Sequence, residues 1–284
     1  RQALGLALDY KWMNRQMFYN AYQRVNGLFG NTDCQAGGLP EASELALLEP
    51  WRSEVPGAVF GNMTAPPRTD GQQSLRGNLR QAQALLKAAG WEVRDGVLKN
   101  ARGETFVIEY LDSNEAGARV VTPWARNLEK LGIALKFRPV DFALYQQRLQ
   151  KFEFDITSLA YGGTHNPGQE YADLFGSKAA DVEDSGNMSG IKSPAVDALI
   201  GAMTAARTRA ELLPACRALD KAVSARERLL KRQGRRATLM RCVAVPPVTA
   251  NDLGFDNDVD AAIGLSTVAA IWADRAVLRA GAAA

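Results

Sequence analysis

Residues 78–111, NLRQAQALLKAAGWEVRDGVLKNARGETFVIEYL, carry the clearest structural signals in this chain of 284 residues. Apolar residues at helical spacing predict a helix that Asn78 caps and Gly90 ends. Asp95-Gly96 lies between two short apolar runs, which predicts a β-hairpin because both residue types tolerate a positive φ. Residues 106–111 then predict a strand. The stretch therefore predicts a helix, a hairpin and a strand in immediate succession.

Helical and strand periodicities also alternate on both sides of this stretch. Because the two types of element follow each other in turn, the fold class expected is α/β, with a mixed sheet and flanking helices. The expected helices lie at 2–22 (one or two), 40–51 inside a long loop region at 26–75, 116–131, 142–149, from 193 and at 209–223; the further strands lie at 133–140 and 154–161.

Charge and composition exclude some classes of partner. The net charge is only +3, so no global field attracts nucleic acid. A basic block at 226–241 has no interleaved aromatic residues to stack on bases, so we expect no nucleic-acid partner. Phe255 and Trp272 are the only aromatic residues after residue 222. This change in composition predicts a boundary between a lobe at 1–223 and a divergent or poorly ordered tail at 224–284.

No motif in the sequence predicts a reaction or a metal site. The chain has one histidine, His165, no Walker or GxGxxG motif and no Gly-x-Ser-x-Gly elbow. We therefore expect no catalytic residue, no metal and no cofactor. The cysteines, Cys34, Cys216 and Cys242, are odd in number and lack CxxC spacing, so we expect neither a zinc site nor a disulfide framework.

Five segments, in order, resemble the family 5 extracellular solute-binding proteins, and the second of them resembles the YejA-like branch. The resemblance covers about residues 1–223. The segments are RQALGLALDYKWMNRQMFYNAY (1–22), GLPEASELALLEPWR (38–52) with the Pro66-Pro67 loop, residues 78–111, NLEKLGIALKFRPVDFALYQQRLQKFEFDI (127–156) and NMSGIKSPAVDALI (187–200).

The resemblance implies a type II periplasmic binding protein-like fold and a binding function without catalysis. It implies that the chain is a fragment with most of the C-terminal lobe, an incomplete domain whose first lobe and signal peptide lie upstream. The implied protein is a periplasmic monomer that closes on a peptide or peptide-like solute and delivers it to an ABC permease in the inner membrane. The alternatives are a non-transport sensor or chaperone-like module, and a hydrolase whose site residues lie upstream.

A peptide receptor must read the backbone, because the side chains of its ligands vary. The loop after the last strand is the best candidate for this contact, since loops at strand ends carry binding in open α/β sheets. Tyr145 and Arg148 on the preceding helix are further candidates, with a core tyrosine and a solvated arginine as the alternatives. The candidate loop residues are Tyr161, Gly162, Gly163, Thr164, His165 and Asn166. Many peptide receptors carry an acidic residue where this chain has Gly163, so this loop is not expected to pair with a free N-terminus.

Overall fold

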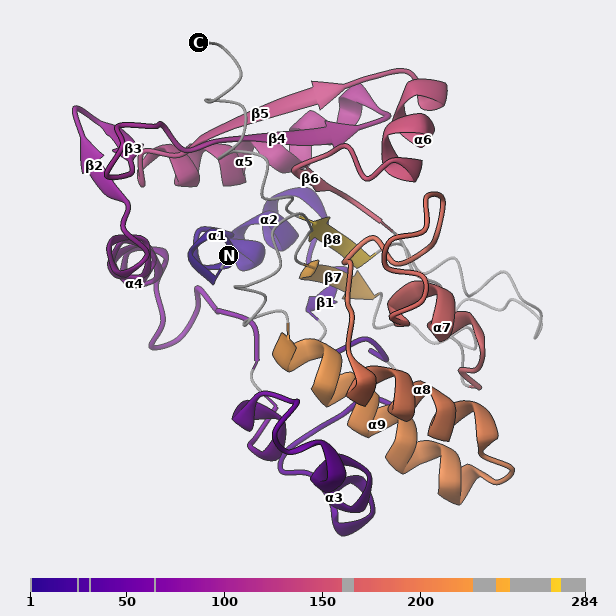
Figure 1. Ribbon diagram of the computed structural model, residues 1–284. Coiled ribbons are helices and arrows are strands. Elements are labelled where there is room, and N and C mark those ends of the chain that lie inside the picture. The colour runs from indigo at the N-terminus through magenta and orange to yellow at the C-terminus, as the bar shows by residue number, and fades with distance from the viewer. Residues whose placement is uncertain are drawn as a thin grey trace.

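The computed structural model (Figure 1) describes residues 2–24, 26–30, 32–63, 65–159, 166–226, 239–245 and 267–271. Within these residues, each helix is too short or too polar to serve as a membrane span. The elements are α1 (Gln2–Leu6), α2 (Tyr10–Met17), β1 (Gln23–Arg24), α3 (Ala42–Leu48), η1 (Glu49–Trp51), η2 (Gly57–Phe60), α4 (Leu75–Ala88), β2 (Glu92–Arg94), β3 (Val97–Lys99), β4 (Val107–Asp112), η3 (Glu115–Gly117), α5 (Ala118–Glu129), β5 (Ala134–Pro139), α6 (Phe142–Gln150), β6 (Ile156–Thr157), α7 (Glu170–Phe175), α8 (Pro194–Ala205), α9 (Arg209–Arg226), β7 (Leu239–Val245) and β8 (Thr267–Ile271).

A three-stranded parallel sheet has β4 at its centre, with β5 on one side and β6 on the other. Successive residues of β4 point to opposite faces, so Tyr110 joins one hydrophobic core and Leu111 the other. Pro139 ends the edge strand β5, where proline removes no hydrogen bond from the centre of the sheet. The predicted strands at 106–111 and 133–140 are confirmed. Among the described residues of the expected strand at 154–161, which are 154–159, β6 comprises Ile156–Thr157.

The helix and hairpin before this sheet form as expected, apart from the helix cap. Ser74, not Asn78, caps α4, and its hydroxyl accepts a first-turn backbone N–H at 3.1 Å. Asn78 is buried, and its side-chain amide donates to the Arg68 carbonyl at 2.7 Å, so a tertiary partner occupies the predicted cap. Gly90 follows the helix with φ +84°, and the hairpin turns at Asp95-Gly96, whose φ values are +54° and +78°.

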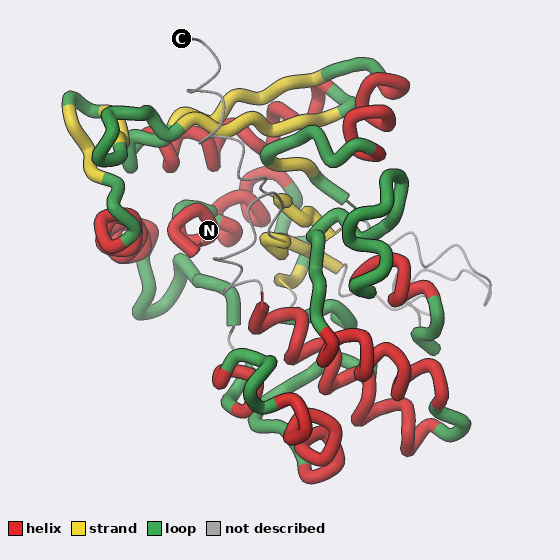
Figure 2. The backbone as a smooth tube through the Cα atoms, viewed as in Figure 1, coloured by secondary structure: helices red, strands yellow, loops and turns green. Residues whose placement is uncertain are grey.

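Two hydrophobic cores share the strand β4, which gives Tyr110 to the first and Leu111 to the second. The helices that surround both cores can be followed in Figure 2. The first contains residues of α1, α2, α4 and α5, and the second residues of α3, α6, α7, α8 and α9. The N-terminal helices are also fixed by hydrogen bonds. The Trp124 indole donates to the Leu4 carbonyl and the Asn127 amide to the Ala7 carbonyl, each at 3.0 Å. These bonds cross 120 residues of sequence and attach α5 to the start of the chain.

A disulfide between Cys34 and Cys216 of α9 shows that the expectation of no disulfide was wrong. The two cysteines are 182 residues apart in sequence, but packing brings their Cα atoms within 5.4 Å. Residues 32–41, here called the strap, make further contacts with α9. Asp220 accepts the Ala36 N–H at 3.0 Å, and Lys221 donates to the carbonyls of Gly37 and Gly38. The strap is therefore held on α9 by a covalent bond and by buried polar groups.

A small antiparallel sheet joins the two ends of the chain, because β7 pairs with both β1 and β8. It lies between the parallel sheet and the helices α8 and α9 (Figure 1). The α/β class with flanking helices is confirmed, with the parallel and antiparallel pairs in separate sheets. The boundary between a lobe at 1–223 and a tail at 224–284 stays a prediction.

Candidate functional site

The carboxyl ends of β4, β5 and β6 meet at one edge of the parallel sheet, where open α/β folds bind their ligands. The candidate loop leaves the sheet at this edge, directly after Ser158 and Leu159. Five of its predicted ligand-contact residues lie outside the described residues, and their role stays a prediction; they are Tyr161, Gly162, Gly163, Thr164 and His165. Asn166 is described.

Ser158 is anchored by two tyrosines from opposite faces of the sheet. The hydroxyl of Tyr110, which belongs to the first core, hydrogen-bonds to the Ser158 hydroxyl. The hydroxyl of Tyr145, which belongs to the second core, lies 3.1 Å from the Ser158 carbonyl and 3.0 Å from the Thr157 hydroxyl. Burial raises the pKa of Tyr145, so this phenol stays protonated and donates. Ser158, three residues before the first residue of the candidate loop, is therefore held in one position.

Asn166, at the other end of the candidate loop, is hydrogen-bonded to the helix α9. Its side-chain oxygen accepts from the Arg209 guanidinium at 3.2 Å. Arg209, the first residue of α9, also pairs with Asp33 of the strap through a bond of 3.0 Å. Both flanks of the candidate loop are thus attached to rigid elements, one to the sheet and one to α9.

Arg148 is placed away from the strand ends, although it lies on the same helix as Tyr145. Its guanidinium forms an ion pair of 2.7 Å with Glu109 and donates to the Glu153 carbonyl at 2.9 Å. The Arg148 side chain is only 15% exposed, so the alternative of a solvated arginine does not match the structure. Tyr145 has the surroundings of a core tyrosine, which was the alternative for that residue. A ligand contact by either residue stays a prediction.

Sequence reasoning did not single out Tyr110, Asp112 or Ser158. Asp112 ends β4, where its carboxylate accepts the Asn114 N–H and its carbonyl accepts the Val140 N–H, both at 3.0 Å. These bonds fix the turns that follow β4 and β5. The run Asp-Ser-Asn directly after the apolar residues of β4 was the available signal, because such residues fold turns at strand ends.

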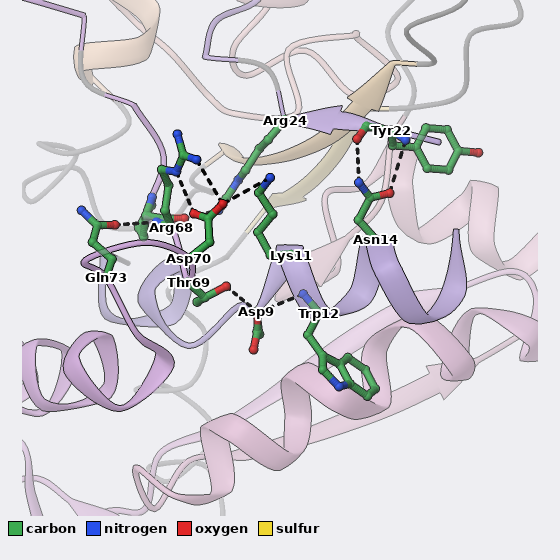
Figure 3. Close-up of polar contacts among 11 residues, drawn as sticks. Asp9, Lys11, Trp12, Asn14, Tyr22, Arg24, Arg68, Thr69, Asp70 and Gln73 are labelled. Carbon is green, nitrogen blue, oxygen red and sulfur yellow. Dashed lines mark hydrogen bonds and ion pairs between the residues drawn. The ribbon is translucent and has the colours of Figure 1, made fainter. Parts of the chain in front are cut away.

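A second polar cluster fixes residues 67–73 against α2 and β1 (Figure 3). Asp70 pairs with Arg68 at 2.8 Å and with Lys11 at 3.3 Å, and these cations hold the pKa of its carboxyl below the usual range. Asp9 accepts both the Trp12 backbone N–H and the Thr69 hydroxyl. Exposed pairs of this kind contribute little to stability, so the cluster mainly positions the segment.

Comparison with known proteins gives the same family over most of the chain. The model for "Bacterial extracellular solute-binding proteins, family 5 Middle" matches residues 1–182. The chain is 38% identical over 226 residues to the "Probable peptide-binding protein YejA" of Agrobacterium fabrum, which covers 79% of this chain and 37% of that relative. It is 30% identical over 222 residues to the "Peptidoglycan-binding protein YepA" of the same organism, covering 78% of this chain and 36% of the relative.

The fold also resembles a solved structure, that of the oligopeptide-binding protein from Thermus thermophilus complexed with a pentapeptide. The TM-score is 0.57 at 17% identity, and the match covers 79% of this chain and 35% of that protein. This likeness confirms the expected type II binding-protein fold. The chain spans little more than a third of the length of the curated relatives that it matches.

Proposed function

The chain belongs to the family 5 bacterial extracellular solute-binding proteins, and on that premise we propose that it acts in the substrate-binding component of an ABC importer for peptides or peptide-like solutes. It binds and does not catalyse. The observation that supports the proposal is that Ser158, near the carboxyl edge of the parallel sheet before the candidate loop, and Asn166 at the loop's end are both held by hydrogen bonds. A site between two fixed points at the end of a parallel sheet suits the extended backbone of a peptide, which loop and strand backbone can pair with.

The proposed ligand is a peptide or a peptide-bearing fragment of the cell wall. Two relatives carry the printed names peptide-binding and peptidoglycan-binding, and the similar solved structure holds a pentapeptide. Both classes of ligand contain peptide bonds, which backbone N–H and C=O groups of a receptor can pair with whatever the side chains of the ligand. Tyr161 of the candidate loop would add a flat apolar surface with a polar tip.

In the proposed cycle, the ligand is enclosed between this lobe and a second lobe, and binding stabilises the closed form. The closed monomer then delivers the solute to a permease in the inner membrane. The proposed location is the periplasm. The Cys34–Cys216 disulfide supports it, because such bonds persist in oxidising compartments and are rare in the cytosol.

Titration of the isotope-labelled chain with a mixture of short peptides, followed by NMR, tests this function. We expect concentration-dependent shifts of the amide signals of Ser158 and Asn166, with weak affinity because this lobe supplies only part of the contacts. Ser158→Ala removes the hydroxyl that Tyr110 holds and is expected to reduce the shifts, whereas Ser53→Ala, at an exposed position, leaves them unchanged. Shifts confined to other regions, or the same shifts with free amino acids, would contradict the proposal.

A further inference from the structure

A depression of about 370 Å³ lies between α4 and the end of α5, and its lining combines cations with leucines. Leu75, Leu79 and Leu131 form the apolar part of the lining. The rest consists of Arg76, Arg80, Gln83 and Lys130, all of which are exposed. No acidic residue lines this depression, here called the α4 groove. It is thus amphipathic and carries charge of one sign.

The cations of the α4 groove have no acidic partner within the part of the chain that the structure describes. Arg76 and Arg80 form no ion pair there, and the Lys130 ammonium donates to the neutral Asn127 oxygen at 3.0 Å. Arginines on a protein surface are usually close to carboxylates that partly neutralise them, so three unneutralised cations around one depression produce a positive local potential.

The position of Arg76 adds to this potential. It lies in the first turn of α4, a helix with no acidic residue in that turn. The N-terminal end of a helix carries a partial positive charge, so a cation there is unfavourable for the helix. The partial charge of this helix end and the Arg76 guanidinium therefore have the same sign, and both add to the positive potential of the groove.

We propose that the α4 groove is the docking site for an acidic, amphipathic segment of a partner protein. The leucines would take apolar side chains of that segment, and the three cations would face its carboxylates. The cations that line the groove are exposed, so the groove is open to solvent. A pocket for a small molecule encloses most of its ligand, so an extended or helical segment fits this open groove better. Figure 1 shows α4 at the opposite side of the molecule from α6, so docking there leaves the carboxyl edge of the sheet accessible.

Fluorescence anisotropy of a labelled synthetic helix with glutamates and leucines at i, i+4 spacing tests the proposal on the full chain. We expect saturable binding that weakens with added salt, and no binding of the same helix with lysine in place of glutamate. Arg76→Glu combined with Arg80→Glu is expected to weaken binding about tenfold or more. Its melting temperature should be equal to or higher than that of the unchanged protein, because glutamate in place of Arg76 is favourable in the first turn of α4.

The matched control is Lys87→Glu combined with Arg119→Glu, which makes the same change in net charge at exposed positions outside the groove. Binding by this variant should stay within about twofold of the unchanged protein. An equal loss in both double variants would show unspecific attraction to positive charge and overturn the proposal. Binding to anionic lipid vesicles without binding to the acidic helix would assign the groove to a membrane surface, and no binding to either probe would also overturn it.

Discussion

The hydroxyl of Tyr145 fixes the backbone before the candidate loop, because it hydrogen-bonds to the Ser158 carbonyl and to the Thr157 hydroxyl. Tyr145→Phe leaves the Ser158 carbonyl without this donor, and we expect the free energy of unfolding to fall by about 1 kcal/mol. Chemical denaturation followed by fluorescence measures the change. Tyr19→Phe is the control, because Tyr19 is 89% exposed, and it should have no measurable effect. A loss as large in the control would contradict the role given to Tyr145.

Glu44 is a buried carboxyl that makes stability depend on pH. Burial is the main cause that raises its pKa above 4.5, with the Lys221 ammonium acting in the opposite direction. The folded protein therefore binds this proton more tightly than the unfolded chain, so the contribution is fully present below pH 4.5 and is lost as the pH rises through the folded value.

Glu44→Gln removes this titration. We expect the stability of the variant, relative to the unchanged protein, to increase as the pH is raised from about 4 to about 7. Urea denaturation at a series of pH values measures the difference. A difference that is constant with pH would contradict the assignment. Glu41→Gln is the comparison, because Glu41 is exposed and belongs to the same turn.

For single residues, the sequence indicates which side chains are polar or aromatic, but it does not indicate which partners they contact. Tyr145 contacts Ser158 before the candidate loop and Asn166 contacts Arg209, whereas ligand contact by either residue stays a prediction. Ser158 and Tyr110 were missed because their importance comes from a contact between residues 48 apart in the sequence. Arg148 was chosen for its charge, but this charge is paired with Glu109 of the strand β4, a partner that no local pattern indicates.

Glycine at the end of α5 is required by the packing of one element on another. Gly132 has φ +74°, its carbonyl accepts the Leu98 N–H at 2.8 Å, and an added Cβ would lie 2.5 Å from that nitrogen. We expect Gly132→Ala to lower the free energy of unfolding by more than about 1 kcal/mol, the cost of a strained backbone. Thermal unfolding measures the loss.

Gly201 provides the matched control, because it lies within α8 and nothing lies within 4 Å of an added Cβ. Gly201→Ala should raise stability by about 0.5–1 kcal/mol, since alanine is the better helix former. If both substitutions destabilised the protein equally, the packing argument for Gly132 would fail.

Most elements could be predicted because their signals are local. Asp95-Gly96, Gly90 and the sequence Ser193-Pro194 mark turns and helix ends through their own backbone preferences, and each prediction is confirmed. The cap of α4 was predicted at Asn78 because the pattern cannot show that the Arg68 carbonyl takes its side chain.

The Cys34–Cys216 disulfide connects the strap to α9, and its two cysteines are 182 residues apart in the sequence. Replacing both cysteines by alanine removes a constraint on the unfolded chain and so raises its conformational entropy. We expect the free energy of unfolding to fall by about 2–5 kcal/mol. Differential scanning calorimetry measures it. A reductant should lower the melting temperature of the unchanged protein towards that of the variant and leave the variant unaffected; a melting temperature that does not respond to reductant would contradict the expectation.

The pairing of these cysteines could not be predicted, because connectivity depends on which helices pack together. Three cysteines allow three single pairings, and the spacing favours none of them. Asp220 and Lys221, which hold the strap beside Cys216, also had no pattern that marked them as buried. The lobe as a whole was predicted through family resemblance, which carries the tertiary information that periodicity lacks.

The positions of Cys34 and Cys216 in the sequence limit when their disulfide can form. Cys34 is made 182 residues before Cys216, so its thiol stays without its native partner while that stretch is synthesised. Cys242 is made soon after Cys216, so the thiols of both residues can react with Cys34. The native crosslink can therefore form only after Cys216 has been made, and an enzyme that reshuffles wrongly joined sulfurs would increase the yield of the native pairing.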